Sequence, residues 1–153
     1  MTEPLVAPHV LEWGYTRSLG PTLTTFFTGL RDKQIFGAKT KSGRVIVPPT
    51  PHDPETGDDI DEMVEVADAG VVETWSFVEK PRPKHPLQTP FSWALIKLDG
   101  ADTAMLHVVD GAIETGSRVK AKWRDETVGY ITDIECFVPL LSAPPLRSGE
   151  HQA

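Results

Sequence analysis

Four positions between residues 39 and 56 have the spacing of zinc ligands without the side chains that bind zinc. The first pair of positions is Lys39 and Ser42, followed by Gly43. The second pair is Asp53 and Thr56, followed by Gly57. A zinc ribbon has two Cys-x-x-Cys turns of this form, separated by a short β-hairpin. None of the four positions carries a thiolate here. The pattern therefore predicts a zinc-ribbon-like knuckle without a metal, and no zinc is expected.

The other reactive side chains do not form a complete catalytic set. The chain has no Gly-x-Ser-x-Gly elbow and no glycine-rich phosphate loop. His107 lies inside an apolar strand pattern and is interpreted as a strand-face residue rather than a base. Cys136 lies in an apolar run and is interpreted as a buried structural thiol. The acidic segment 50–62 lacks the spacing of a calcium loop and is interpreted as a solvated loop.

A basic cluster interrupts this acidic chain. Lys80, Arg82, Lys84 and His85 alternate with prolines in a connection between two predicted strands. One interpretation is a solubilising loop. The other is a contact with a polyanionic ligand such as the phosphates of coenzyme A.

Length, charge and cysteine content bound the function. The 153 residues suffice for one domain, or for one domain with a small appendage. The formal net charge of −7 disfavours binding to nucleic-acid phosphates. The single cysteine excludes an internal disulfide framework and suits a cytoplasmic location. We see no signal peptide and no run of about 20 apolar residues that would predict a membrane span.

One helix is predicted near the N-terminus. Pro21 suits a first helical position, and Leu23, Phe26, Phe27 and Leu30 follow with helical spacing. This aromatic stripe either covers the edge of its own domain or binds a partner subunit. The short length favours the partner, because an isolated helix of three turns is marginally stable.

Most of the remaining chain has strand patterns. Short strands flank the first knuckle turn, and five longer strands are predicted at 71–78, 91–98, 104–109, 118–123 and 130–138. Five strands of this kind predict a mainly β fold with a small closed barrel. The predicted parts are an N-terminal extension with the helix (1–34), the knuckle (35–66), the barrel (67–141) and a disordered tail (142–153).

The order of these parts resembles a known family. The features that carry the resemblance are the aromatic helix, the Pro48-Pro49 pair after the knuckle hairpin, the strand 70–78 and the closing strand 131–139. Together they resemble the acyl-CoA-associated OB-fold proteins with a rubredoxin-like zinc ribbon, known as domain of unknown function 35. The resemblance covers roughly residues 15 to 140. It implies a five-stranded OB-fold barrel preceded by the helix and the degenerate ribbon.

The resemblance also implies a function beside a thiolase. Members of this family act with lipid-transfer-protein-like thiolases in retro-aldol cleavage of steroid side-chain coenzyme A thioesters. By this resemblance the chain is an accessory subunit of an aldolase, in a hetero-tetramer whose catalytic residues lie on the partner. The helix stripe would bind that partner. The acyl-CoA contacts would be Trp13, Tyr15, Trp75, Lys80, Arg82 and Lys84.

Two other functions stay open. The chain could be a non-catalytic scaffold that channels acyl-CoA between a thiolase and a second coenzyme A enzyme. A weaker alternative is an OB-fold binder of single-stranded nucleic acid, which the net charge opposes.

Overall fold

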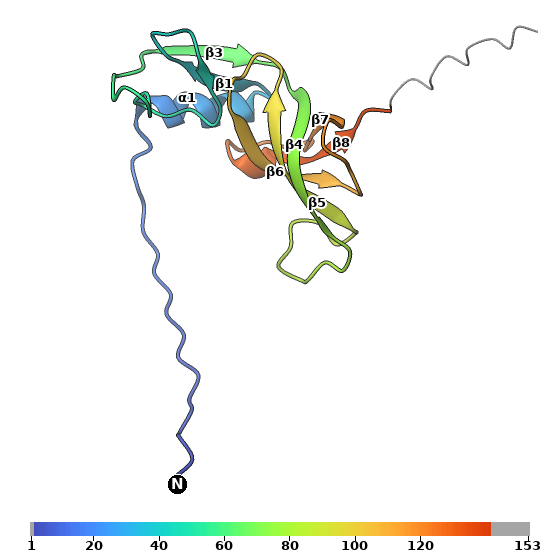
Figure 1. Ribbon diagram of the computed structural model, residues 1–153. Helices are drawn as coiled ribbons and strands as arrows, with labels where there is room; N and C mark the ends of the chain where they lie inside the picture. Colours follow the sequence, from blue (N-terminus) through green and yellow to red (C-terminus); the bar gives the residue numbers. More distant parts are fainter. Residues whose placement is uncertain (1, 142–153) are drawn as a thin grey trace, which may run out of the picture.

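The computed structural model describes residues 2–141, so the predicted tail at 142–153 lies outside the described residues. Residues 2–19 form no helix or strand and run away from the folded body (Figure 1). The helix α1 (Gly20–Arg31) follows, and eight strands and one 3-10 turn make up the rest.

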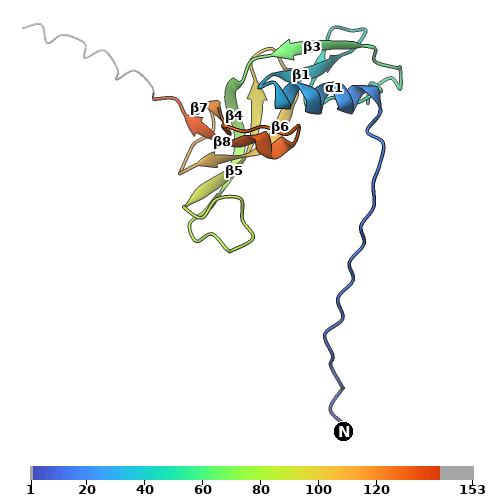
Figure 2. The ribbon, with the colours of Figure 1, turned by 180° about the vertical axis from the view of Figure 1, so that it is seen from behind.

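A three-stranded antiparallel sheet contains the knuckle. Its strands are β1 (Ile35–Lys39), β2 (Val45–Ile46) and β3 (Glu62–Val66), in the order β2-β1-β3. The helix α1 packs against β1 and covers this sheet (Figure 2). The packing is close, because a Cβ added at Gly29 of α1 would come within 2.5 Å of the Phe36 ring.

The remaining strands close into a barrel. They are β4 (Ala69–Val78), β5 (Phe91–Leu98), β6 (Ala104–Asp110), β7 (Arg118–Trp123) and β8 (Ile134–Pro139), in the order β4-β5-β6-β8-β7. All neighbours are antiparallel except β6 and β8. Five strands closed by one parallel pair form an OB-like barrel. The predicted mainly β fold with an N-terminal helix is confirmed.

The predicted closing strand begins too early. Residues 130–138 read as one strand, but Ile131–Asp133 form the 3-10 turn η1 and β8 starts at Ile134. The reason is the Asp133 carboxylate, which turns back to accept hydrogen bonds from three preceding backbone N–H groups. An extended backbone could not make these contacts.

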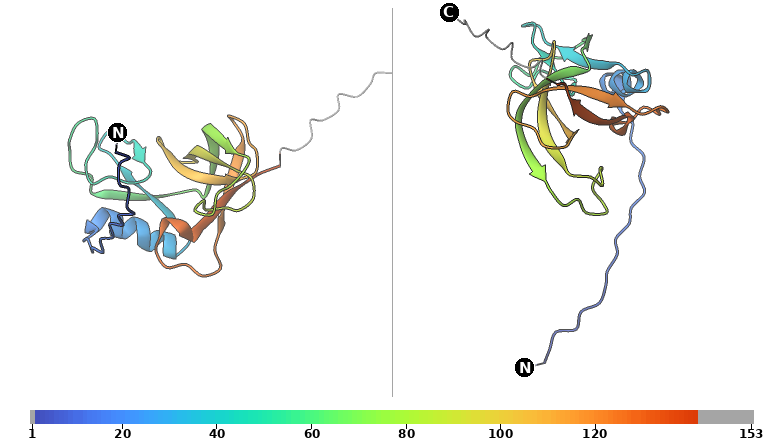
Figure 3. Two further views of the ribbon diagram at one scale, coloured as in Figure 1. Left: turned by 90° about the horizontal axis from the view of Figure 1, so that it is seen from below. Right: turned by 90° about the vertical axis from the view of Figure 1, so that its right-hand side faces the viewer.

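The sheet and the barrel share one hydrophobic core, which also includes residues of α1. Hydrogen bonds join them where the β5–β6 turn meets β2. The Val45 N–H donates to an Asp102 carboxylate oxygen at 2.8 Å, and the Val47 N–H donates to Thr103 Oγ1 at 2.8 Å. The two units therefore lie side by side as one body (Figure 3).

The helix stripe does not form an exposed face. Phe26 and Leu30 are 2% and 0% exposed and belong to the shared core. The prediction that these two residues bind a partner is wrong, because their side chains already pack against the sheet and barrel. Leu23 and Phe27 are half-buried, so their contact with a partner stays a prediction.

Among residues 2–141, no helix is long and apolar enough to cross a membrane.

Candidate functional site

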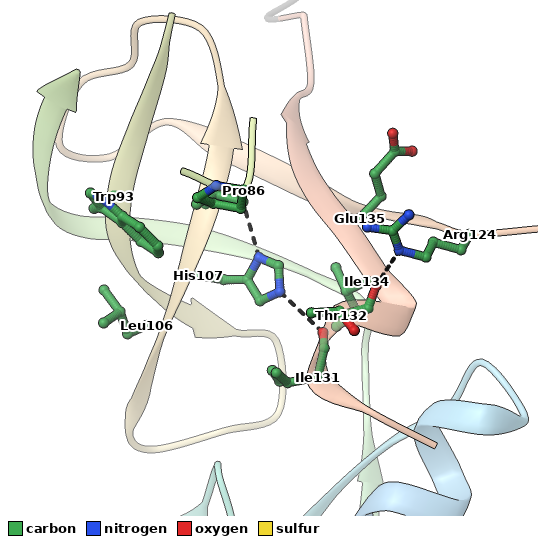
Figure 4. A pocket seen from close by; sticks show the side chains of 10 residues that line it. Pro86, Trp93, Leu106, His107, Arg124, Ile131, Thr132, Ile134 and Glu135 are labelled. Atoms are coloured by element: carbon green, nitrogen blue, oxygen red, sulfur yellow. Dashed lines mark hydrogen bonds between the residues drawn. The ribbon is translucent and has the colours of Figure 1, made fainter. Parts of the chain in front are cut away.

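A groove opens on the barrel between β6 and β8. These two strands form a parallel pair with Val109 opposite Phe137, and the groove lies on the η1 side of that pair. The groove has a volume of about 200 Å³, and its walls are mostly apolar. Its lining residues come from the β4–β5 loop, β5, β6, the β7–β8 loop, η1 and β8 (Figure 4); they are Pro86, Trp93, Leu106, His107, Val108, Arg124, Ile131, Thr132, Ile134 and Glu135. OB folds bind their ligands on this face, between the loops that here join β4 to β5 and β7 to β8.

His107 lies at the back of the groove with both ring nitrogens near backbone carbonyls. Nδ1 is 3.4 Å from the Val108 oxygen, and Nε2 is 3.4 Å from the Ile131 oxygen. Burial lowers the pKa of His107, and the two carbonyls oppose this effect without overcoming it. A neutral imidazole donates one hydrogen bond. One ring nitrogen of His107 therefore keeps a lone pair that could accept a hydrogen bond from a bound molecule.

The polar side chains at the β8 side of the groove are already engaged. The Arg124 Nε donates to the Thr132 oxygen at 2.6 Å, which fixes the guanidinium beside η1 (Figure 4). A Glu135 carboxylate oxygen lies 3.0 Å from the Lys122 Nζ. These contacts hold the wall in place. They do not form a nucleophile and base pair.

The basic cluster lies on the β4–β5 loop, which contributes Pro86 to the groove. His85 and Gln88 order this loop. The His85 Nδ1 accepts the Arg82 N–H at 3.0 Å, and the Gln88 amide donates to the His85 oxygen at 3.0 Å. Lys80, Arg82 and Lys84 are exposed, and within residues 2–141 none of them forms an ion pair. They remain free to meet an anion beside the groove.

The structure separates the aromatic residues predicted to contact acyl-CoA. Trp13 and Tyr15 lie on the extended N-terminal segment, away from the barrel (Figure 1). Trp75 is on β4 beside Ala94 and is not among the groove residues. Trp93 and Leu106 do line the groove and were not predicted from the sequence. Their alternation with buried residues along β5 and β6 was the available signal.

The knuckle has two turns, and each ends at a glycine. The Gly43 N–H donates to the Thr40 oxygen at 2.9 Å, and the Gly57 N–H donates to the Asp53 oxygen at 2.8 Å. Both glycines have positive φ angles, 89° and 78°, which other residues adopt only with strain. The glycines that suggested a ribbon are thus needed for the turns themselves.

The four ligand positions do not fit a zinc ion. The Lys39 Nζ contacts a Glu62 carboxylate at 3.3 Å. The Ser42 hydroxyl shares a hydrogen bond with Thr40, and an Asp53 carboxylate oxygen accepts the Glu55 N–H at 2.9 Å. Structural zinc requires four thiolate or imidazole ligands. Residues 2–141 contain no cluster of three or more His, Cys, Asp or Glu side chains arranged for a metal.

Ion pairs join the two turns instead. Lys41 of the first turn lies 3.4 Å from the Asp58 carboxylate of the second. Arg44, next to the first turn, pairs with Glu55 in the second. These two contacts link residues at the first turn to residues at the second.

Comparisons with known proteins agree with this architecture. Residues 63–124 match the family model described as ChsH2, C-terminal OB-fold domain. A structure of a protein of unknown function from the DUF35 family of Sulfolobus solfataricus is similar, with 27% identity and a TM-score of 0.57, over 67% of this chain and 78% of that chain. None of the curated proteins matches the sequence.

A second solved structure is similar over more of the chain. It is the Ltp2-ChsH2(DUF35) aldolase, with 21% identity and a TM-score of 0.55, over 81% of this chain and 95% of that chain. At this identity the likeness concerns the fold. Together with the family model and the DUF35 structure, it confirms the resemblance of this chain to the OB-fold proteins of domain of unknown function 35.

Proposed function

We propose that this chain is an accessory subunit of a thiolase-like aldolase that acts on acyl-CoA thioesters. The observation that carries the proposal is the match of residues 63–124 to the ChsH2 OB-fold domain, since a similar structure comes from an aldolase of Ltp2 with ChsH2. The proposed reaction is retro-aldol cleavage in steroid side-chain degradation. The partner would remove the proton of the β-hydroxyl and stabilise the enolate formed at the thioester.

The size of the groove supports a shared site. Pockets that enclose a ligand alone usually measure about 300–1,000 Å³. The groove of about 200 Å³ is smaller and is open at the surface. It can hold a slim, mostly apolar part of an acyl-CoA molecule, and the partner would enclose the rest.

The chemistry of the side chains supports the same division of work. The groove offers apolar contact from Trp93 and Leu106 and one hydrogen-bond acceptor from His107. The cations Lys80, Arg82 and Lys84 would lie near the coenzyme A phosphates.

Co-expression with a candidate thiolase-like partner tests the proposal. We expect the two proteins to elute as one complex and to cleave a β-hydroxyacyl-CoA to a ketone and a shorter acyl-CoA. Separate elution, with cleavage that does not require this chain, would refute the proposal. Co-purification of two different coenzyme A enzymes, neither needing this chain for turnover, would instead support the scaffold.

The cations can be tested in the same assay. Replacing Lys80, Arg82 and Lys84 by Gln should raise KM for the acyl-CoA about tenfold, since each exposed charge contact contributes about 0.2–1 kcal/mol. The matched control replaces the exposed Lys33 and Lys120 by Gln. Equal KM values in the two variants would show that the basic loop does not bind the phosphates.

A further inference from the structure

The segment 2–19, called the arm, carries exposed apolar side chains, and before Leu19 none of them lines a hollow of the folded body. Every residue of the arm is exposed, and its N-terminal part runs far from the barrel (Figures 1 and 3). Trp13 and Tyr15 are 82% and 85% exposed. Leu11, Trp13 and Tyr15 alternate with Glu12 and Gly14, which is the pattern of a segment that lies extended along an apolar surface.

The arm joins the body at an apolar shelf. The shelf consists of Leu19, Phe27, Val128 and Tyr130, which surround two shallow hollows. Val128 and Tyr130 are 72% and 65% exposed, and the rings of Phe27 and Tyr130 are 6.3 Å apart. Leu19 is both the last residue of the arm and a wall of the hollows. The exposed apolar surface is therefore continuous from arm to shelf.

Hydrogen bonds fix the shelf before anything binds to it. The backbone N–H groups of Val128, Gly129 and Tyr130 all donate to the Asp133 carboxylate, at 2.7–3.0 Å. The Thr127 hydroxyl donates to the Arg31 oxygen and attaches this loop to the end of α1. A surface held in this way loses little freedom on binding.

The described part of the chain offers no receptor for its own arm. The hollows at the shelf measure about 120 and 180 Å³, which is room for one or two side chains. The groove of the barrel is about 200 Å³. The net charge of −7 also opposes close association of two copies. An extended segment of this length needs a longer apolar groove on a different protein.

We propose that the arm and the shelf together are the surface that binds the thiolase-like subunit. This inference rests on the proposed function and moves the partner contact away from the buried Phe26 and Leu30. The available area is sufficient. Aromatic side chains bury about 150–250 Å² each when fully covered, so Trp13, Tyr15 and Tyr130, at their observed exposures, offer roughly 350–600 Å². The other exposed apolar side chains of the arm and shelf bring the total to about the 800 Å² per partner of a standard interface; they are Leu5, Val6, Val10, Leu11 and Val128.

Titration calorimetry with the same thiolase-like protein, purified, tests the inference. The full chain carries either W13A with Y15A in the arm or Val128→Glu in the shelf. We expect each variant to bind at least about thirtyfold more weakly, as for hot-spot residues. Phe77→Ala is the matched control, because Phe77 is an exposed aromatic residue on the distant β4. Circular dichroism should show an unchanged fold in all variants.

The possible outcomes separate this inference from the proposed function. If the wild-type chain binds and the arm variant binds equally well, the inference is wrong and the proposed function stands. If the wild-type chain does not bind, both are wrong. If the chain alone forms a dimer that W13A with Y15A converts to a monomer, the arm binds a second copy, and the inference is again wrong.

Discussion

Replacing Asp133 by Asn should destabilise the protein by about 2–4 kcal/mol. The Asp133 side chain is buried, and its carboxylate accepts the N–H groups of Val128, Gly129 and Tyr130 at 3.0, 2.7 and 3.0 Å. A hydrogen bond to a charged group contributes about 1.5–3 kcal/mol, and an unsatisfied buried donor costs about 1–3 kcal/mol. Asn has the same size, but it loses the charge and turns an NH₂ group toward these donors.

The pH dependence of the effect follows from the pKa of Asp133. Burial raises the pKa of Asp133. The three N–H donors and the nearby Arg124 charge lower it by more than burial raises it, so the net shift is downward. A carboxyl whose pKa is lower in the folded than in the unfolded protein stabilises the fold at every pH above its unfolded pKa of about 3.9. This stabilisation is lost as the pH falls from the unfolded pKa through the folded pKa. The difference between wild type and variant should therefore shrink below about pH 4.

Urea unfolding between pH 3 and pH 7 measures both effects. Asp125→Asn is the control, because Asp125 is an exposed carboxylate in the same loop. A variant at Asp133 that is as stable as the Asp125 control at pH 7 would show that the three bonds do not hold the loop. A difference that stays constant down to pH 3 would show that the charge of Asp133 is not the cause.

Three further predictions concern the knuckle and the groove. A double-mutant cycle with Arg44→Gln and Glu55→Gln should give a coupling free energy of about 0.5–1 kcal/mol that shrinks in 1 M NaCl; no coupling would mean that the pair does not join the turns. Metal analysis of the purified protein should find no stoichiometric zinc, and EDTA should leave the Tm unchanged; a lower Tm would contradict the ion-pair knuckle. The His107 ring should titrate in NMR spectra below the usual histidine pKa, because burial lowers that pKa. Because the folded protein favours the neutral ring, this preference costs no stability above the unfolded pKa of about 6.5, and the protein loses stability as the pH falls below that value. Titration at the usual histidine pKa would show that the ring lies in solvent.

The barrel could be predicted from the sequence because its signals are local. Residues of β5 and β7 alternate between core and surface, and the turn at Asp99 and Gly100 separates β5 from β6. The 3-10 turn at Ile131–Asp133 was missed because Ile-Thr-Asp-Ile also has a strand pattern. What decides the conformation there is the position of one carboxylate relative to three N–H groups, and residue types alone do not contain that information.

The candidate site was less predictable, since its residues come from distant parts of the sequence. The basic loop was found by composition. Ile131 lies near Trp93 and His107 only because the barrel closes with β8 next to β6. The helix shows the opposite error. Its stripe was correctly interpreted as apolar. The spacing of Phe26 and Leu30 does not show whether they pack against the same chain or against another protein.

Three features of this chain are incomplete in ways that one partner would complete. The groove is smaller than a pocket that encloses a ligand, and the described residues beside it include no nucleophile and base pair. The arm carries Trp13 and Tyr15 at more than 80% exposure, although burial of such side chains is strongly favourable. The knuckle keeps the two ribbon turns with only exposed or half-exposed ion pairs between them. A subunit that closes the groove and receives the arm would strengthen the first two, because apolar contacts gain when water is excluded. One that covers the knuckle would increase the attraction between the paired charges, against the cost of removing water from them. The arm variants of the full chain should therefore lower the affinity of the complex without changing the stability of the free protein.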